Sequence, residues 1–330
     1  MAGNGENEYE LPTQKTRLNG EPRRVGFELE FSGIDLAQTV SAVRSVVNAN
    51  IIAQSEAEVA LDVEGLGQFN IEIDWAYLKS KAAEQDLSDQ RRDWIALLSQ
   101  AAAMFVPVEV VCPPIEMSRL SELTPIVKAL QNAGAIGTEE SFISAYGVHI
   151  NTEIPALDAA TLNTYIRAYA LLQWWLVDMH KVDVARRISP YIDLYSEAYL
   201  KQVLSHPEAT LDQIFDDYLS HNPSRNRALD LLPLLAEIDE ERVRSVVDDP
   251  RIKPRPTFHY RLPDCHIERK DWSLTTPWYS WLVVEKLAAS SQGLHELATD
   301  FLNFERPLLG VSRAEWVQHI DVWLKDHALL

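Results

Sequence analysis

Cysteines, long apolar runs and targeting signals are scarce in, or absent from, this sequence of 330 residues. Its two cysteines, Cys112 and Cys265, lie in strand-like segments outside any metal or redox spacing, which argues against a disulfide framework and fits a reducing compartment. No apolar run approaches the roughly 20 residues of a membrane-spanning helix. Because residues 1–20 lack the basic start and apolar middle of a signal peptide, we expect a cytoplasmic protein with no membrane partner.

Basic residues are also few: 30 Lys and Arg stand against 49 Asp and Glu, which gives a formal net charge of −19. This balance argues against nucleic acid or an anionic membrane as the main partner. The sequence contains neither a P-loop nor a dinucleotide-binding fingerprint, and Gly65-Leu66-Gly67 is typical of a turn. Nucleotide-binding loops of those two kinds are therefore excluded.

Apolar material is ample, because 46% of the residues are hydrophobic and nine are tryptophan. The polar residues 1–20, rich in Gly, Asn and Glu, predict a disordered tail. By length, the chain could form one large domain or two ordinary ones.

Alternation is clearest in Arg24–Phe31. A β-strand there places the carboxylates of Glu28 and Glu30 on one face and apolar side chains on the other. Paired acids on the far face of a buried strand are costly without positive charge. The stretch therefore predicts half of a cation site; the alternative is an edge strand with a wetted polar face.

Four further segments repeat this division into an apolar and a polar face: residues 68–75, 107–114, 145–152 and 257–263. The polar residues of the five predicted strands are Glu28, Glu30, Glu72, Asp74, Glu109, His149, Asn151, His259 and Arg261. In one sheet these acids would need cations. Carboxylates with few nitrogens and no thiolates favour Mg²⁺ or Mn²⁺ over zinc. Such an ion implies a phosphate-bearing substrate such as ATP.

Helical periodicity predicts helices over residues 35–48, 124–133, 156–181, 197–205, 211–220, 228–238, 277–289, 293–304 and 312–327, with helix-favouring sequence over 76–103. Asp35 and Thr124 are expected N-caps and Gly134 a C-cap. Two basic loops, with Arg186 and Arg187 in one and Arg225 and Arg227 in the other, could hold a phosphoryl group or a substrate carboxylate. A solvated helix end and a salt-bridged loop are the structural alternatives.

The order of motifs over residues 23–290 resembles the amidoligase branch of the glutamine synthetase and glutamate-cysteine ligase superfamily, whose members include carboxylate-amine ligases. The motifs are Gly26-Phe27-Glu28-Leu29-Glu30-Phe31, Ile71-Glu72-Ile73-Asp74, Glu109-Val110-Val111-Cys112-Pro113-Pro114, Gly147-Val148-His149, Asn222-Pro223-Ser224-Arg225-Asn226-Arg227 and Arg255-Pro256-Thr257-Phe258-His259-Tyr260-Arg261. The resemblance implies an α+β, glutamine synthetase-like fold: a curved antiparallel sheet with helices packed on one face and a helical C-terminal region. It also implies that residues 21–330 form a single catalytic domain with helical insertions.

The resemblance also implies ATP-dependent amide formation through an acyl phosphate, from a small-molecule or peptide carboxylate and an amine. Glu28 and Glu30 would each face one of two metals, and Arg261 would contact the phosphates. Either Glu72 or Glu109 would complete the metal shell, and His149 would serve metal or nucleotide. Arg225 and Arg227 are further phosphate candidates, and Asn151, Arg186 and Arg187 are candidates for the substrate.

This chain departs from the superfamily pattern at one position. Two residues before the arginine, where the superfamily has a metal-binding glutamate, it has His259, followed by Arg261. Since imidazole is neutral and softer than carboxylate, the metal site is expected to be weaker or altered. A phosphotransferase of the same superfold and a non-catalytic binding protein with a decayed site are therefore the alternative functions.

Overall fold

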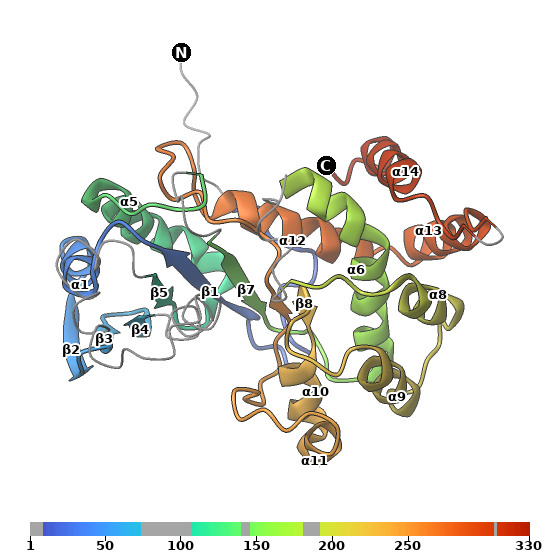
Figure 1. Cartoon of the computed structure of the whole chain (residues 1–330), viewed down its shortest axis with the longest axis horizontal. Coiled ribbons are helices and arrows are strands. Elements are labelled where there is room, and N and C mark those ends of the chain that lie inside the picture. Colours follow the sequence, from blue (N-terminus) through green and yellow to red (C-terminus); the bar gives the residue numbers. More distant parts are fainter. Residues whose placement is uncertain (1–8, 74–106, 140–145, 181–191, 307–308) are drawn as a thin grey trace, which may run out of the picture.

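The computed structural model describes residues 9–73, 107–139, 146–180, 192–306 and 309–330, and these contain an antiparallel sheet of nine strands. The strands are β1 (Arg24–Phe31), β2 (Ala49–Gln54), β3 (Glu58–Val63), β4 (Gly67–Ile73), β5 (Val108–Val111), β6 (Ile115–Glu116), β7 (Val148–Thr152), β8 (Leu229–Asp230) and β9 (His259–Tyr260). Their order is β2-β3-β4-β5-β1-β7-β9-β8, with β6 beside the start of β1. The sheet runs from β2 at the left to β8 at the centre of Figure 1.

Helices surround the sheet and form the C-terminal part of the described chain (Figure 1). They are α1 (Leu36–Arg44), α5 (Thr124–Ala133), α6 (Ala159–His180), α8 (Glu197–Ser205), α9 (Leu211–His221), α10 (Leu232–Ile238), α11 (Glu240–Arg244), α12 (Thr275–Ala288), α13 (Ser291–Asn303), α14 (Arg313–Asp326) and the 3₁₀ helix η1 (Met117–Leu123). The helix α1 contacts β3 and β4, α12 contacts β7, and α6 packs against α8, α12, α13 and α14. No helix in the described ranges is long and apolar enough to cross a membrane.

The sheet has an apolar face because its strands alternate in register. Phe27, Leu29 and Phe31 of β1 are at most 2% exposed. Leu29 lies opposite Val110 of β5 and Val148 of β7, both also buried. The opposite face of β1 carries Glu28 and Glu30. The predicted antiparallel sheet in an α+β chain is thus confirmed, and the predicted division of faces holds in β1.

Most predicted helices appear within a few residues of their expected limits, and two boundary predictions were wrong. The segment 228–238 is not one helix: Leu229–Asp230 forms β8, and α10 begins at Leu232. Pro233 lacks an N–H and fits only the first turn of a helix, which fixes that start. Thr124 is the first residue of α5, not its N-cap, because η1 runs directly into the helix.

Other local predictions are confirmed. Asp35 caps α1 and exchanges hydrogen bonds with Gln38, and Gly134 ends α5 with φ 97°. Both cysteines are buried. The helix-favouring segment 76–103 lies outside the described residues. The strand β2 was not predicted, because its polar and apolar residues do not alternate.

Part of the predicted N-terminal tail, from Tyr9 on, is among the described residues and contacts the folded chain. Tyr9 is only 8% exposed, and the indole of Trp278 donates to the carbonyl of Glu10 at 2.8 Å. The Arg23 amide pairs with the carbonyl of Lys15. Tyr9, Leu11 and Pro12 supply enough apolar surface to hold an otherwise polar segment. The division into tail and single domain stays a prediction.

Candidate metal centre

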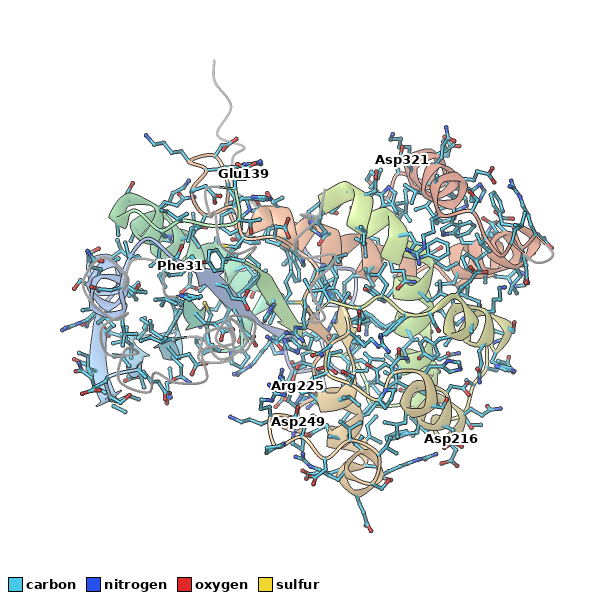
Figure 2. All side chains as sticks on the ribbon, in the orientation of Figure 1. Phe31, Glu139, Asp216, Arg225, Asp249 and Asp321 are labelled. Atoms are coloured by element: carbon cyan, nitrogen blue, oxygen red, sulfur yellow. The ribbon has the colours of Figure 1, made fainter. Side chains whose placement is uncertain are left out.

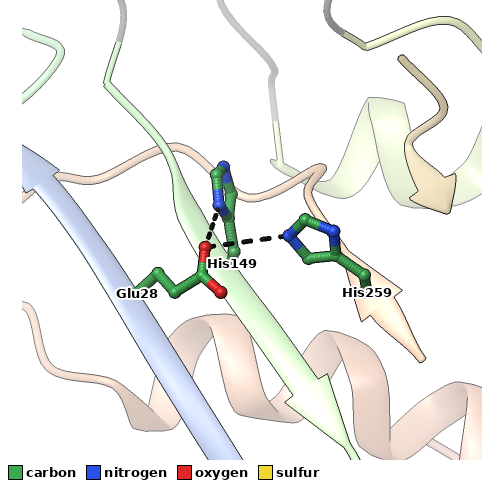
Figure 3. A group of neighbouring side chains, drawn as sticks. All are labelled: Glu28, His149 and His259. Atoms are coloured by element: carbon green, nitrogen blue, oxygen red, sulfur yellow. Dashed lines mark hydrogen bonds and ion pairs between the residues drawn. The ribbon is translucent and has the colours of Figure 1, made fainter. Parts of the chain in front are cut away.

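Glu28 lies at the centre of a polar cluster on the sheet, where side chains from β1, β7 and β9 point toward one another (Figure 3). Its Oε2 is 2.8 Å from Nδ1 of His149, the residue opposite it in the β1–β7 register. Asn151 donates its amide Nδ2 to Glu28 Oε1 at 2.8 Å. The Nε2 of His259 is 3.7 Å from Glu28 Oε2. Because side chains alternate along each strand, these residues lie on one face of the sheet. The order of the strands then brings them close together.

The charge state of this cluster follows from its contacts. Burial by itself would raise the pKa of Glu28, but the imidazoles of His149 and His259 hold it well below its usual range. An ionised carboxylate only accepts hydrogen bonds, so the bonded Nδ1 of His149 must carry a proton. Burial lowers the pKa of His149 and favours its neutral ring. The lone pair is then on Nε2, which is 3.5 Å from Glu30 Oε1.

Two groups of potential ligand atoms overlap here, each within 4.8 Å: Glu28, His149 and His259 form one, and Glu30, Glu109 and His149 the other. Carboxylate oxygens and imidazole nitrogens are suitable donors for a divalent cation. Both ring nitrogens of His259 are buried and have no hydrogen bond within the described part of the chain. Since such unpaired atoms are uncommon, the donor set fits a bound ion.

The strand register separates the two carboxylates that the sequence left undecided. Glu109 lies directly opposite Glu30 in the β1–β5 pair. Glu72 lies one strand farther away, opposite Glu109. The geometry therefore groups Glu109, and not Glu72, with Glu30 and His149. Asp74 lies outside the described residues.

Arginines border the cluster on the side of β9. The charge of Arg261 contributes to the lowered pKa of His149, and Arg261 Nη1 donates to the carbonyl of Arg225 at 2.9 Å. Burial lowers the pKa of Arg225, which lies near Asp249 in the lower part of Figure 2. Arg227 donates its Nη2 to the carbonyl of His221 at 3.1 Å.

Two residues beside the cluster were not predicted as site residues from the sequence. Arg255 donates to Asn151 Oδ1 at 3.0 Å, and Asp230 Oδ2 lies 3.6 Å from Nδ1 of His259. Asp230 is fully buried. An acid within Ala228-Leu229-Asp230-Leu231-Leu232 could have been a signal, but the segment was assigned to a helix. Arg186 and Arg187 lie outside the described residues.

In a comparison with known families, the family described as "Putative amidoligase enzyme" matches residues 21–283. The chain belongs to this amidoligase family. The chain matches no curated protein and no solved structure. The amidoligase match spans the strands that carry Glu28, Glu109, His149 and His259. It confirms the amidoligase resemblance and indicates a ligase-type function with small-molecule substrates.

Proposed function

We propose that this amidoligase is an ATP-dependent carboxylate-amine ligase with a glutamine synthetase-like sheet and a centre for Mg²⁺ or Mn²⁺. One observation carries the proposal: within the region matched by the family, Glu28, Glu30 and Glu109 converge with two imidazoles next to Arg261. Acidic ligands for a cation beside a guanidinium are what a transferring phosphoryl group requires. The wider superfamily and cytoplasmic location remain part of the proposal.

The reaction has two steps. An oxygen of the substrate carboxylate attacks the γ-phosphorus of ATP, the bond from that phosphorus to the β–γ bridging oxygen breaks, and ADP leaves. The amine nitrogen then attacks the acyl carbon, and the carbon–oxygen bond to phosphate breaks. The amine loses a proton, and an amide and inorganic phosphate result.

The residues of the chain have distinct roles in this reaction. A bound divalent cation would neutralise phosphate charge, held by Glu28 with His259 and by Glu30 with Glu109 and His149. Arg261 would stabilise the charge on the transferred phosphoryl group, and Arg225 would add positive charge next to it. Asn151 supports Glu28 and is a candidate for contact with the substrate. Arg186 and Arg187 stay candidates for holding the substrate carboxylate.

The test is ADP release in mixtures of carboxylates and amines. We expect release to depend jointly on both substrates. Glu28→Gln and Arg261→Ala should reduce turnover by about 10²-fold or more, because each removes charge from the phosphoryl site. ADP release that continues unchanged in both variants would contradict the site assignment.

Calorimetry separates the alternatives. The parent protein should bind Mg·ATP, and Glu30→Gln should weaken that binding. Glu58→Gln is the matched control: it makes the same change on an exposed carboxylate of β3, which lies opposite Glu72. Absence of Mg·ATP binding in the parent under saturating metal would favour a non-catalytic binding protein, and a phosphorylated end product without an amide would favour a phosphotransferase.

A further inference from the structure

Asp230 lies beside the proposed metal centre and has no role in the function described so far. The strand β8 pairs with β9 and places Asp230 opposite His259. Its carboxylate is completely buried. Oδ1 accepts a hydrogen bond from the amide of Leu232 at 2.9 Å. That bond fixes the carboxylate with its other oxygen, Oδ2, toward Nδ1 of His259.

Three buried atoms around His259 have no hydrogen bond among the described residues: Asp230 Oδ2 and the two ring nitrogens. The Asp230–Nδ1 distance is 3.6 Å and the Nε2–Glu28 distance is 3.7 Å. Both exceed the roughly 3.2 Å limit of an N–H···O hydrogen bond. Leaving buried polar atoms unpaired is costly. A cation bound between Nε2 and Glu28 would give Nε2 a partner. A short movement of the ring toward Asp230 would bring Nδ1 within hydrogen-bonding distance of Oδ2.

His149 shows the same arrangement one strand away. Its Nδ1 is bonded to Glu28, and its Nε2 faces Glu30. Each imidazole is therefore flanked by one carboxylate at Nδ1 and another at Nε2. Histidines that bind metals are commonly held in this way, because the carboxylate at one nitrogen fixes the proton there and leaves the lone pair at the other.

We infer that Asp230 is a positioning residue that keeps the proton of His259 on Nδ1 and directs Nε2 to a cation shared with Glu28, so that the centre prefers Mn²⁺ to Mg²⁺. This inference rests on the metal centre of the proposed function. A neutral imidazole has one lone pair, so the tautomer decides whether His259 can bind. Mg²⁺ takes oxygen ligands and keeps several waters, whereas Mn²⁺ also accepts imidazole.

Asp230→Asn is a sharp test because the two side chains have the same shape. The Leu232 amide needs an acceptor, which keeps the Asn oxygen in the place of Oδ1. The Asn NH₂ group then faces Nδ1 of His259 and favours the proton on Nε2. The variant thus retains the fold-supporting bond and blocks the lone pair that would bind the ion.

The measurements are Mn²⁺ and Mg²⁺ affinity by calorimetry and ¹⁴N coupling in pulsed EPR of the Mn²⁺-loaded full chain. The parent should show coupling to two imidazoles. Asp230→Asn should show one, with Mn²⁺ affinity weakened about 10- to 100-fold and Mg²⁺ affinity changed less. Asp62→Asn, at an exposed position of β3, should behave as the parent.

If Asp230→Asn keeps the nitrogen coupling and the Mn²⁺/Mg²⁺ preference of the parent, the inference is overturned. The ligase proposal is then still tested separately, by the ADP-release assay. Loss of one coupling in a protein that forms no ADP would support the inference while the ligase proposal fails. If circular dichroism shows that Asp230→Asn does not fold, His259→Gln is decisive, because two coupled nitrogens in that variant would also overturn the inference.

Discussion

Glu28 shows how a carboxylate can be placed among buried side chains at this face of the sheet. Its side chain is 18% exposed, and an amide and two imidazoles surround its oxygens. The alternation of β1 predicts the face on which Glu28 lies. It does not predict the hydrogen bond from Asn151 to Glu28 or the tautomer of His149, because both depend on the neighbouring strand and its register.

Tyr9 provides a test of the packed N-terminal segment. Burial raises the pKa of its phenol from 10.0 to about 12. A raised folded-state pKa means that the stabilising contribution is present below pH 10 and is lost as the pH rises from 10 to 12. Relative to Tyr9→Phe, the parent should lose on the order of 1.4 kcal/mol of unfolding free energy by pH 11.

Urea denaturation at pH 8, 10 and 11 measures this difference. At pH 8 the two proteins should be similarly stable, because the phenol is neutral in both the folded and the unfolded parent. Tyr279→Phe, at a partly buried tyrosine of α12, serves as a comparison for the general effect of alkali. A parent-to-Tyr9→Phe difference that does not vary with pH would contradict the burial of Tyr9.

At the scale of elements, the turn after β1 is hydrogen-bonded to the segment that follows α5. Ser32 and Ile136 exchange backbone hydrogen bonds of 2.9 and 2.8 Å. Gly33 has φ +86°, and a Cβ there would lie 2.6 Å from the carbonyl oxygen of Gly134. Positive φ and this close approach both require glycine. The exit of β1, two residues after Glu30, is therefore tightly defined.

Gly33→Ala and Gly20→Ala form a matched pair that separates these two effects. Gly20 has nearly the same φ, +85°, but nothing lies within 4 Å of its Cβ position. Gly20→Ala should lose about 1 kcal/mol from backbone strain alone. Gly33→Ala should lose clearly more, about 3 kcal/mol or above, because the backbone must also move. Equal losses in urea denaturation would show that the contact with Gly134 is easily relieved.

At the scale of the whole molecule, a buried ion pair ties the start of β1 to α12. Arg23 donates to both carboxylate oxygens of Glu285 at 2.7 and 3.0 Å, across 262 residues of sequence. Tyr165 of α6 donates to the same carboxylate, and so does Trp281. Arg23 also donates to the carbonyl of Glu153 at the end of β7. One ion pair thus joins the N-terminal segment, the sheet and two helices.

Removing one partner of this pair should be severely destabilising. Glu285→Gln leaves the Arg23 guanidinium buried without its counter-charge, and we expect a loss of about 3–5 kcal/mol in urea denaturation. The double variant Arg23→Met/Glu285→Met should lose less than the sum of the single Met variants. Glu305→Gln, which breaks an exposed pair with Lys201, should cost less than about 1 kcal/mol. A similarly small loss in Glu285→Gln would contradict the role of the pair.

The sequence by itself determined the two-faced character of β1, the approximate extent of most helices, the cap at Asp35 and the amidoligase motifs. These features depend on side chains a few positions apart, so local periodicity is enough to reveal them. Only the tertiary structure decided which acids meet which imidazoles. Glu28 meets His149 across 121 residues, Glu109 and not Glu72 lies opposite Glu30, and Asp230 lies behind His259. Those contacts follow from strand order and register, which are set by packing between segments far apart in the chain.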